Sequence, residues 1–105
     1  MSIDQNKINK FYEDLFELTP EQQIPKLKEL YKLIWESYKK GVIDREELAY
    51  EIAGTMAFEA TQSGELGELT ELAGELELPE GHVGGNADEK YKRLVELIEK
   101  FVNRE

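Results

Sequence analysis

Apolar residues recur at helical spacing along most of the chain. In the first segment they stand at i, i+3, i+4, i+7 and i+8, at Ile8, Phe11, Tyr12, Leu15 and Phe16. A helix of 3.6 residues per turn places these positions on one face. The pattern therefore predicts an amphipathic helix that begins near Asp4, a candidate N-cap.

A stretch with two prolines, LTPEQQIP, follows this segment. Thr19 and Gln22 have capping-box spacing and Pro20 suits a first helical position, so we expect one short helical turn here. Pro25 lacks an N–H and its ring clashes with a preceding turn, which places it in the first turn of the next helix. That helix runs to about Lys40. Its apolar stripe is Leu27, Leu30, Tyr31, Ile34, Trp35 and Tyr38.

Aromatic side chains are concentrated in these first two helices. Because they follow the helical spacing, we interpret them mainly as core, with a ligand or partner groove as the alternative. The tyrosines and Trp35 need partners for their polar tips, so we expect them at the edge of the core.

A third helix has a clear start signal. Asp44 is the predicted N-cap and Glu47, three residues on, its capping-box partner. We expect the helix to continue to Ala60 along a face of small and apolar residues, with Tyr50 and Phe58 off that face. The face consists of Leu48, Ala49, Ile52, Ala53, Met56, Ala57 and Ala60.

Two more helical segments follow. The first has Ser63 as a plausible N-cap and an apolar face at Leu66, Leu69, Leu72, Ala73 and Leu76. Its glycines either weaken it, at about 1 kcal/mol each relative to alanine, or serve close packing. The last helix has Asn86 as its predicted cap and Glu89 as the box partner. Its buried face is predicted at Tyr91, Leu94, Val95, Ile98, Phe101 and Val102.

The predicted fold class is all-α. We expect a compact bundle of four main helices plus a short helical turn, with no β-sheet, in a single domain over residues 1–105. The pattern leaves open whether the segments 44–60 and 63–76 are one bent helix.

Charge is segregated along the chain, which has a net charge of −10. Residues 46–89, the acidic block, contain 12 Asp and Glu and no Lys or Arg, whereas residues 1–45 are balanced and residues 90–105 carry +2. Such a block repels phosphates and anionic lipids, so neither nucleic acid nor a membrane surface is an expected partner. It attracts a basic protein.

One helix face in this block is the candidate partner-binding site. Four glutamates, here called the glutamate ladder, stand at i, i+3, i+6 and i+10: Glu65, Glu68, Glu71 and Glu75. As catalytic carboxylates they lack the differing environments that separate pKa values. The alternatives are a solvated helix face and a docking surface for a basic protein.

The single histidine, His82, lies in a glycine-rich stretch between two predicted helices. The chain has no cysteine, and the acids around His82 do not have calcium-loop spacing. A phosphate loop would need a Lys-Ser/Thr pair after a strand, which is missing. We therefore expect no catalytic residues, no metal and no cofactor, and interpret the stretch as a helix–helix connection.

These observations favour a small, acidic, non-enzymatic protein-binding module. We expect an inhibitor or adaptor, similar in manner to immunity proteins or nucleic-acid mimics, that docks its acidic helix face on a basic partner. The alternatives are a structural homo-oligomeric bundle and a weak metal or small-ligand site in the 80–89 loop. Without a secretory signal or a spanning apolar run, the expected location is cytoplasmic.

Overall fold

The computed structural model describes residues 5–62, 64–76 and 87–103, and within these residues it contains helices and no strand. Their helical character confirms the predicted all-α class. The elements are α1 (Gln5–Phe16), α2 (Pro20–Lys39), α3 (Arg45–Ala53), the short 3₁₀ turns η1 (Gly54–Ala57) and η2 (Glu59–Thr61), α4 (Gly64–Leu76) and α5 (Ala87–Asn103). These five α-helices differ from the expected four main helices plus a turn, because the expected turn is the start of α2 and because α3 and α4 are separate helices.

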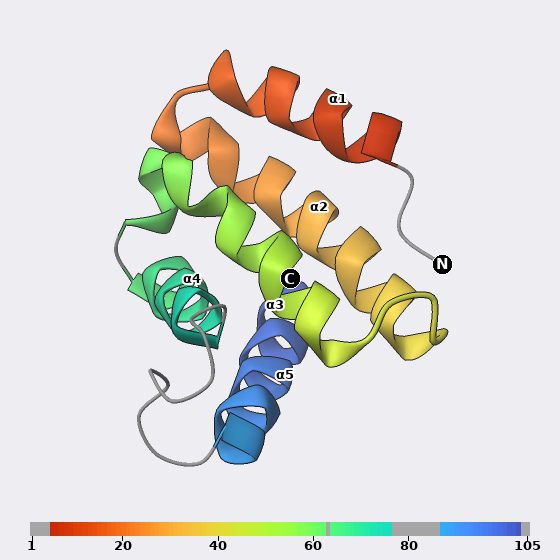
Figure 1. Ribbon diagram of the computed structural model, residues 1–105. Helices are drawn as coiled ribbons and strands as arrows, with labels where there is room; N and C mark the ends of the chain where they lie inside the picture. Colours follow the sequence, from red (N-terminus) through yellow and green to blue (C-terminus); the bar gives the residue numbers. More distant parts are fainter. Residues whose placement is uncertain (1–4, 63, 77–86, 104–105) are drawn as a thin grey trace.

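The helices pack in two groups around one core. In Figure 1, α1, α2 and α3 follow one another side by side, and α4 and α5 lie on the side of α3 away from α1. α5 reaches back to contact both α2 and α4. The C-terminal helix therefore closes the core between the two groups.

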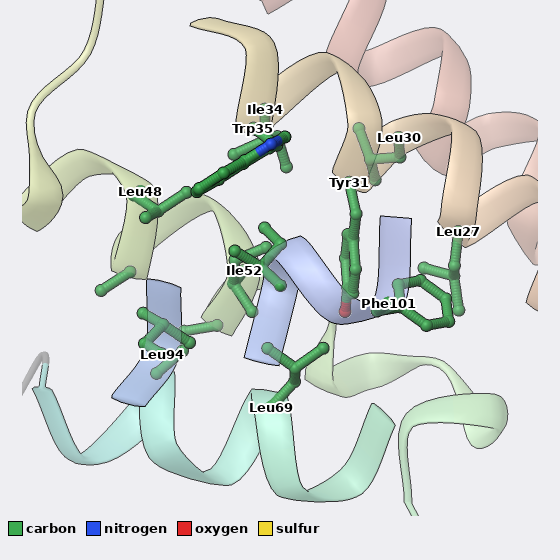
Figure 2. Packing of buried hydrophobic residues seen from close by; sticks show 14 of the residues in the cluster. Leu27, Leu30, Tyr31, Ile34, Trp35, Leu48, Ile52, Leu69, Leu94 and Phe101 are labelled. Atoms are coloured by element: carbon green, nitrogen blue, oxygen red, sulfur yellow. The ribbon is translucent and has the colours of Figure 1, made fainter. Parts of the chain in front are cut away.

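The predicted stripe of α2 forms the centre of this core. Figure 2 shows its side chains pointing toward Ile52 of α3, with Leu69 of α4 and Leu94 of α5 on the opposite side. Tyr31 is fully buried, with its ring 5.5 Å from that of Phe101 in an edge-on arrangement. The expectation that the tyrosines lie at the edge of the core is wrong for Tyr31, because its hydroxyl has a buried partner in Thr55, 2.6 Å away.

Pro25 lies inside α2, so placing it in the first turn of a new helix was wrong. The predicted capping box is present: the Thr19 hydroxyl accepts from the Gln22 backbone N–H, and the Gln22 side chain accepts from the Thr19 N–H. The helix then propagates through Gln23, whose N–H donates to the Thr19 carbonyl at 2.9 Å. Proline removes one later bond, to the carbonyl of Glu21, and since Glu21 is exposed, water can satisfy that carbonyl.

The third helix ends at Ala53, seven residues before the predicted Ala60. Phe58 has extended backbone angles (φ −89°, ψ 136°), which interrupt helical geometry. Its ring is buried against Tyr12 and Phe16, whereas Met56, expected on the buried face, is 45% exposed. Burial of Phe58 thus outweighs continuation of the helix, and α3 and α4 are separate helices.

One of the other predicted caps falls on described residues and is confirmed. The Asp44 carboxylate accepts from the Glu47 backbone N–H at 2.8 Å and caps α3. The predicted caps Asp4, Ser63 and Asn86 lie outside the described residues, as does His82.

Candidate functional site

The glutamate ladder lies on α4, and the helix divides its members. Glu68, Glu71 and Glu75 are exposed, opposite the face that buries Leu66, Leu69 and Ala73 in the core. Glu65 is half-buried at the edge of that face. The structure therefore brings three ladder carboxylates together on a solvent face and sets the fourth apart. The buried residues of α4 are Leu66, Leu69, Thr70, Ala73 and Leu76.

Two ladder carboxylates form ion pairs with α5. Arg93 Nη2 lies 3.0 Å from Glu68 Oε1, and Lys90 Nζ lies 3.3 Å from Glu75 Oε2. The order of the pairs shows that α4 and α5 run antiparallel. Sequence reasoning missed these pairs, although the positive charge of residues 90–105 was a signal that this segment could neutralise the block.

The two ion pairs differ in exposure, since Lys90 is only 24% exposed whereas the Glu68–Arg93 pair is open to water. Both side chains of the Glu68–Arg93 pair are more than half exposed. Exposed pairs of this kind contribute about 0–1 kcal/mol and weaken with salt. The Glu68–Arg93 pair therefore adds little to the stability of the contact between α4 and α5.

Glu71 lies beside a groove between the 3₁₀ segment and α4, here called the 3₁₀–α4 groove. Its volume is about 450 Å³, and it is lined by Met56, Thr61, Gln62, Gly64, Gly67, Glu68, Thr70 and Glu71. A Cβ on Gly67 would lie 3.3 Å from a Gln62 backbone carbon, and one on Gly74 would lie 3.3 Å from Met56 Sδ. Of the two interpretations of the α4 glycines, this close approach supports close packing.

A second groove, here called the α2–α4 groove, opens where α2, η2, α4 and α5 meet. Its volume is about 610 Å³. Apolar groups of Pro20, Ile24, Pro25, Ala60, Leu66 and Phe101 line it, and Glu21, Lys28, Glu59 and Glu65 add charge. Gly64 lines this groove as well as the 3₁₀–α4 groove, so the two are neighbours on the surface.

Gln23 holds together the elements that build this region. Its buried side chain donates from Nε2 to the carbonyls of Leu15 (3.1 Å) and Leu18 (3.3 Å), and its Oε1 accepts from the Ala60 N–H at 3.2 Å. One amide thus links the end of α1, the start of α2 and η2. Sequence reasoning missed Gln23, because a polar residue outside the apolar stripe of a helix gives no pattern that marks it as buried.

Burial and nearby acids raise one tyrosine pKa at the contact between α1 and α3. Burial of the Tyr12 hydroxyl, with the Glu51 carboxylate and Tyr50 adding smaller effects, raises the pKa of Tyr12 to about 12. Glu51 is itself buried on α3. The Tyr12 hydroxyl therefore stays protonated at neutral pH.

We expect this tyrosine to make the protein sensitive to alkali. Because its pKa is raised on folding, its contribution is fully present below pH 10 and is lost as pH rises from 10 through about 12. Urea unfolding across this range should show the free energy of unfolding falling less steeply in Tyr12→Phe than in the native chain. Tyr38→Phe is the control for loss of a hydroxyl, and an equal slope in native and Tyr12→Phe chains would contradict the assignment.

Within 5–62, 64–76 and 87–103, no group of three His, Cys, Asp or Glu side chains is placed to hold a metal ion. No helix in this part of the chain combines the length and apolar character needed to cross a membrane. The alternative site in the 80–89 loop falls largely outside the described residues and stays a hypothesis.

Comparison of the chain with protein-family models, with curated proteins and with solved structures found no match in any of the three.

Proposed function

We propose that this protein is a non-enzymatic binding module that docks on a basic surface of another protein. The observation that carries the proposal is the segment from Glu46 to Leu76, which spans most of α3, the 3₁₀ turns and α4 and has many carboxylates and no Lys or Arg. Its exposed carboxylates are Glu46, Glu59, Glu68, Glu71 and Glu75. Cations reach its α4 edge from α5, through Arg93 and Lys90.

The ion pairs to α5 fit a docking role. A partner cation that replaces Arg93 at Glu68 exchanges one exposed pair for another, so little free energy opposes the exchange. The net charge of −10 adds long-range attraction, which speeds association and makes it sensitive to salt. An inhibitor or adaptor that covers a basic surface needs these two properties and no catalytic group.

The direct test is capture of partners from a lysate of the producing cells at low salt. We expect a basic protein that is retained by the native chain and lost with Glu68→Lys plus Glu71→Lys. Glu99→Lys plus Glu96→Lys, which makes the same charge change on exposed positions of α5, is the matched control. Retention that ignores salt, or equal loss with both double variants, would contradict docking through α4.

A pair of single variants sharpens this prediction. Arg93→Gln removes the cation that competes for Glu68, so we expect it to tighten binding of the captured partner by a few fold, measured by calorimetry. Lys92→Gln makes the same change in net charge from an exposed position on the same helix. Equal tightening by both variants would assign the effect to net charge alone rather than to Glu68.

A further inference from the structure

The α2–α4 groove exposes apolar side chains of α2 that are not buried in the hydrophobic core. Ile24 is 46% exposed, and it lines the groove together with Pro20, one turn before it, and Pro25, the next residue. Leu66 and Phe101, both buried, form the floor between this wall and α4. Single exposed apolar residues are ordinary, but here several surround one concave space.

The walls of the groove are held in place. Pro20 and Pro25 have fixed φ angles, and Ala60 on the opposite wall is tied to α2 through its N–H bond to Gln23. A preformed groove loses little conformational entropy when it is filled. It can therefore accept an apolar side chain without rearrangement of the helices around it.

The charge around the groove is negative. Glu21, Glu59 and Glu65 oppose the single cation Lys28. Helix N-termini attract anions, and those of α2 and α4 are close by, but Glu21 and Glu65 already place carboxylates in these first turns. Gly64 also lines the neighbouring 3₁₀–α4 groove, which contains Glu68 and Glu71.

We infer that the α2–α4 groove binds a large apolar side chain of a basic, amphipathic peptide segment, whose flanking cations meet Glu21, Glu59 and Glu65. The inference rests on the proposed function and specifies the partner's chemistry. Cations of the partner would pair with the carboxylates, but only an apolar side chain would fill the groove. A second copy of this chain, with its own charge of −10, would be repelled. Because the Ile24 side chain is 46% exposed, a small molecule bound beside it would keep much of its surface in water. A peptide would bury more surface, because it extends along both grooves.

The test compares two synthetic peptides by fluorescence anisotropy with the full chain. One is an oligolysine, and the other has the same number of lysines plus leucines at i, i+3, i+4 and i+7. We expect the leucine-containing peptide to bind about tenfold more tightly, and Ile24→Ser to remove most of that gain. Tyr50→Ser is the matched control, since Tyr50 is a large exposed side chain, 63% exposed, and lines neither groove.

The outcomes separate the groove from the acidic surface. The proposed role of the groove is overturned if both peptides bind with equal, salt-sensitive affinity, or if the leucine-containing peptide still binds more tightly to Ile24→Ser. Either result leaves the proposal of docking through carboxylates intact. Loss of the gain in Tyr50→Ser rather than in Ile24→Ser also overturns it. A gain that depends on Ile24 but ignores Glu68→Lys plus Glu71→Lys supports the groove and counts against the α4 face. If light scattering shows that Ile24→Ser converts a dimer to a monomer, the groove binds a second copy of the chain, and the proposal that it binds a basic peptide is overturned.

Discussion

Replacing Gln23 with leucine is expected to lower the free energy of unfolding by about 2–4 kcal/mol, since each buried polar group left without a partner costs about 1–3 kcal/mol. Leucine has nearly the same volume, so little packing is lost. The Leu18 carbonyl loses its side-chain donor and the Ala60 N–H loses its acceptor, whereas the Leu15 carbonyl keeps its bond from the Leu18 N–H. The added apolar burial of leucine offsets part of this cost and keeps the expected value below the largest sum for two groups.

Chemical unfolding followed by circular dichroism measures the effect. Lys32→Ala, at an exposed position of the same helix, should change stability by no more than about 0.5 kcal/mol. Gln23→Glu keeps an acceptor for Ala60 but sets a carboxylate against two carbonyls, so it should regain stability when acid protonates it. A Gln23→Leu variant as stable as the native protein would show that water replaces the amide.

Replacing Thr55 with valine should cost about 1–3 kcal/mol, more than the complementary change Tyr31→Phe. The Thr55 hydroxyl donates to the Ile52 carbonyl at 2.7 Å, so its one hydrogen is used and Tyr31 must donate to it at 2.6 Å. Valine therefore leaves the buried Tyr31 hydroxyl without an acceptor. Tyr31→Phe leaves Thr55 with its bond to Ile52 and should cost about 0.5–1.5 kcal/mol.

A double-mutant cycle isolates this bond. The double variant Tyr31→Phe plus Thr55→Val should be more stable than the sum of the two single changes predicts, by about 1 kcal/mol, because no polar group is then left alone. Tyr38→Phe, on the same helix and half-buried, serves as the control for removing a hydroxyl. Strict additivity would mean that the two hydroxyls do not depend on each other.

The two sets of variants also report on the grooves. Thr55 is linked to Thr61, whose hydroxyl donates to the Thr55 and Phe58 carbonyls, and the Thr61 carbonyl accepts from the Thr70 hydroxyl of α4. Gln23 ties the same 3₁₀ segment to α2. Since this segment forms a wall of both grooves, loosening either contact should weaken peptide binding as well as stability.

Local signals were sufficient for much of the helical structure. The capping box at Thr19, the cap at Asp44 and the stripe of α2 each depend on residues no more than four positions apart, and all three are present. Leu97 was missed on the buried face of α5, which is wider than the predicted stripe. The predicted position of Pro25 is wrong, because the free-energy cost of a proline inside a helix is outweighed by the capping box at Thr19 and by the burial of the α2 stripe in the core.

The sequence by itself determined that the described residues are helical, that Thr19 and Asp44 are caps, and that the negative charge lies in one block. Those properties follow from backbone propensity, capping and composition, which act between near neighbours. The tertiary structure alone decided that α3 ends at Ala53, which ladder carboxylates meet cations, and where an apolar groove remains open. Each depends on contacts between distant residues: 24 positions separate Tyr31 from Thr55, 37 separate Gln23 from Ala60, and 25 separate Glu68 from Arg93. Such contacts form only when the chain folds back on itself, so no local pattern encodes them.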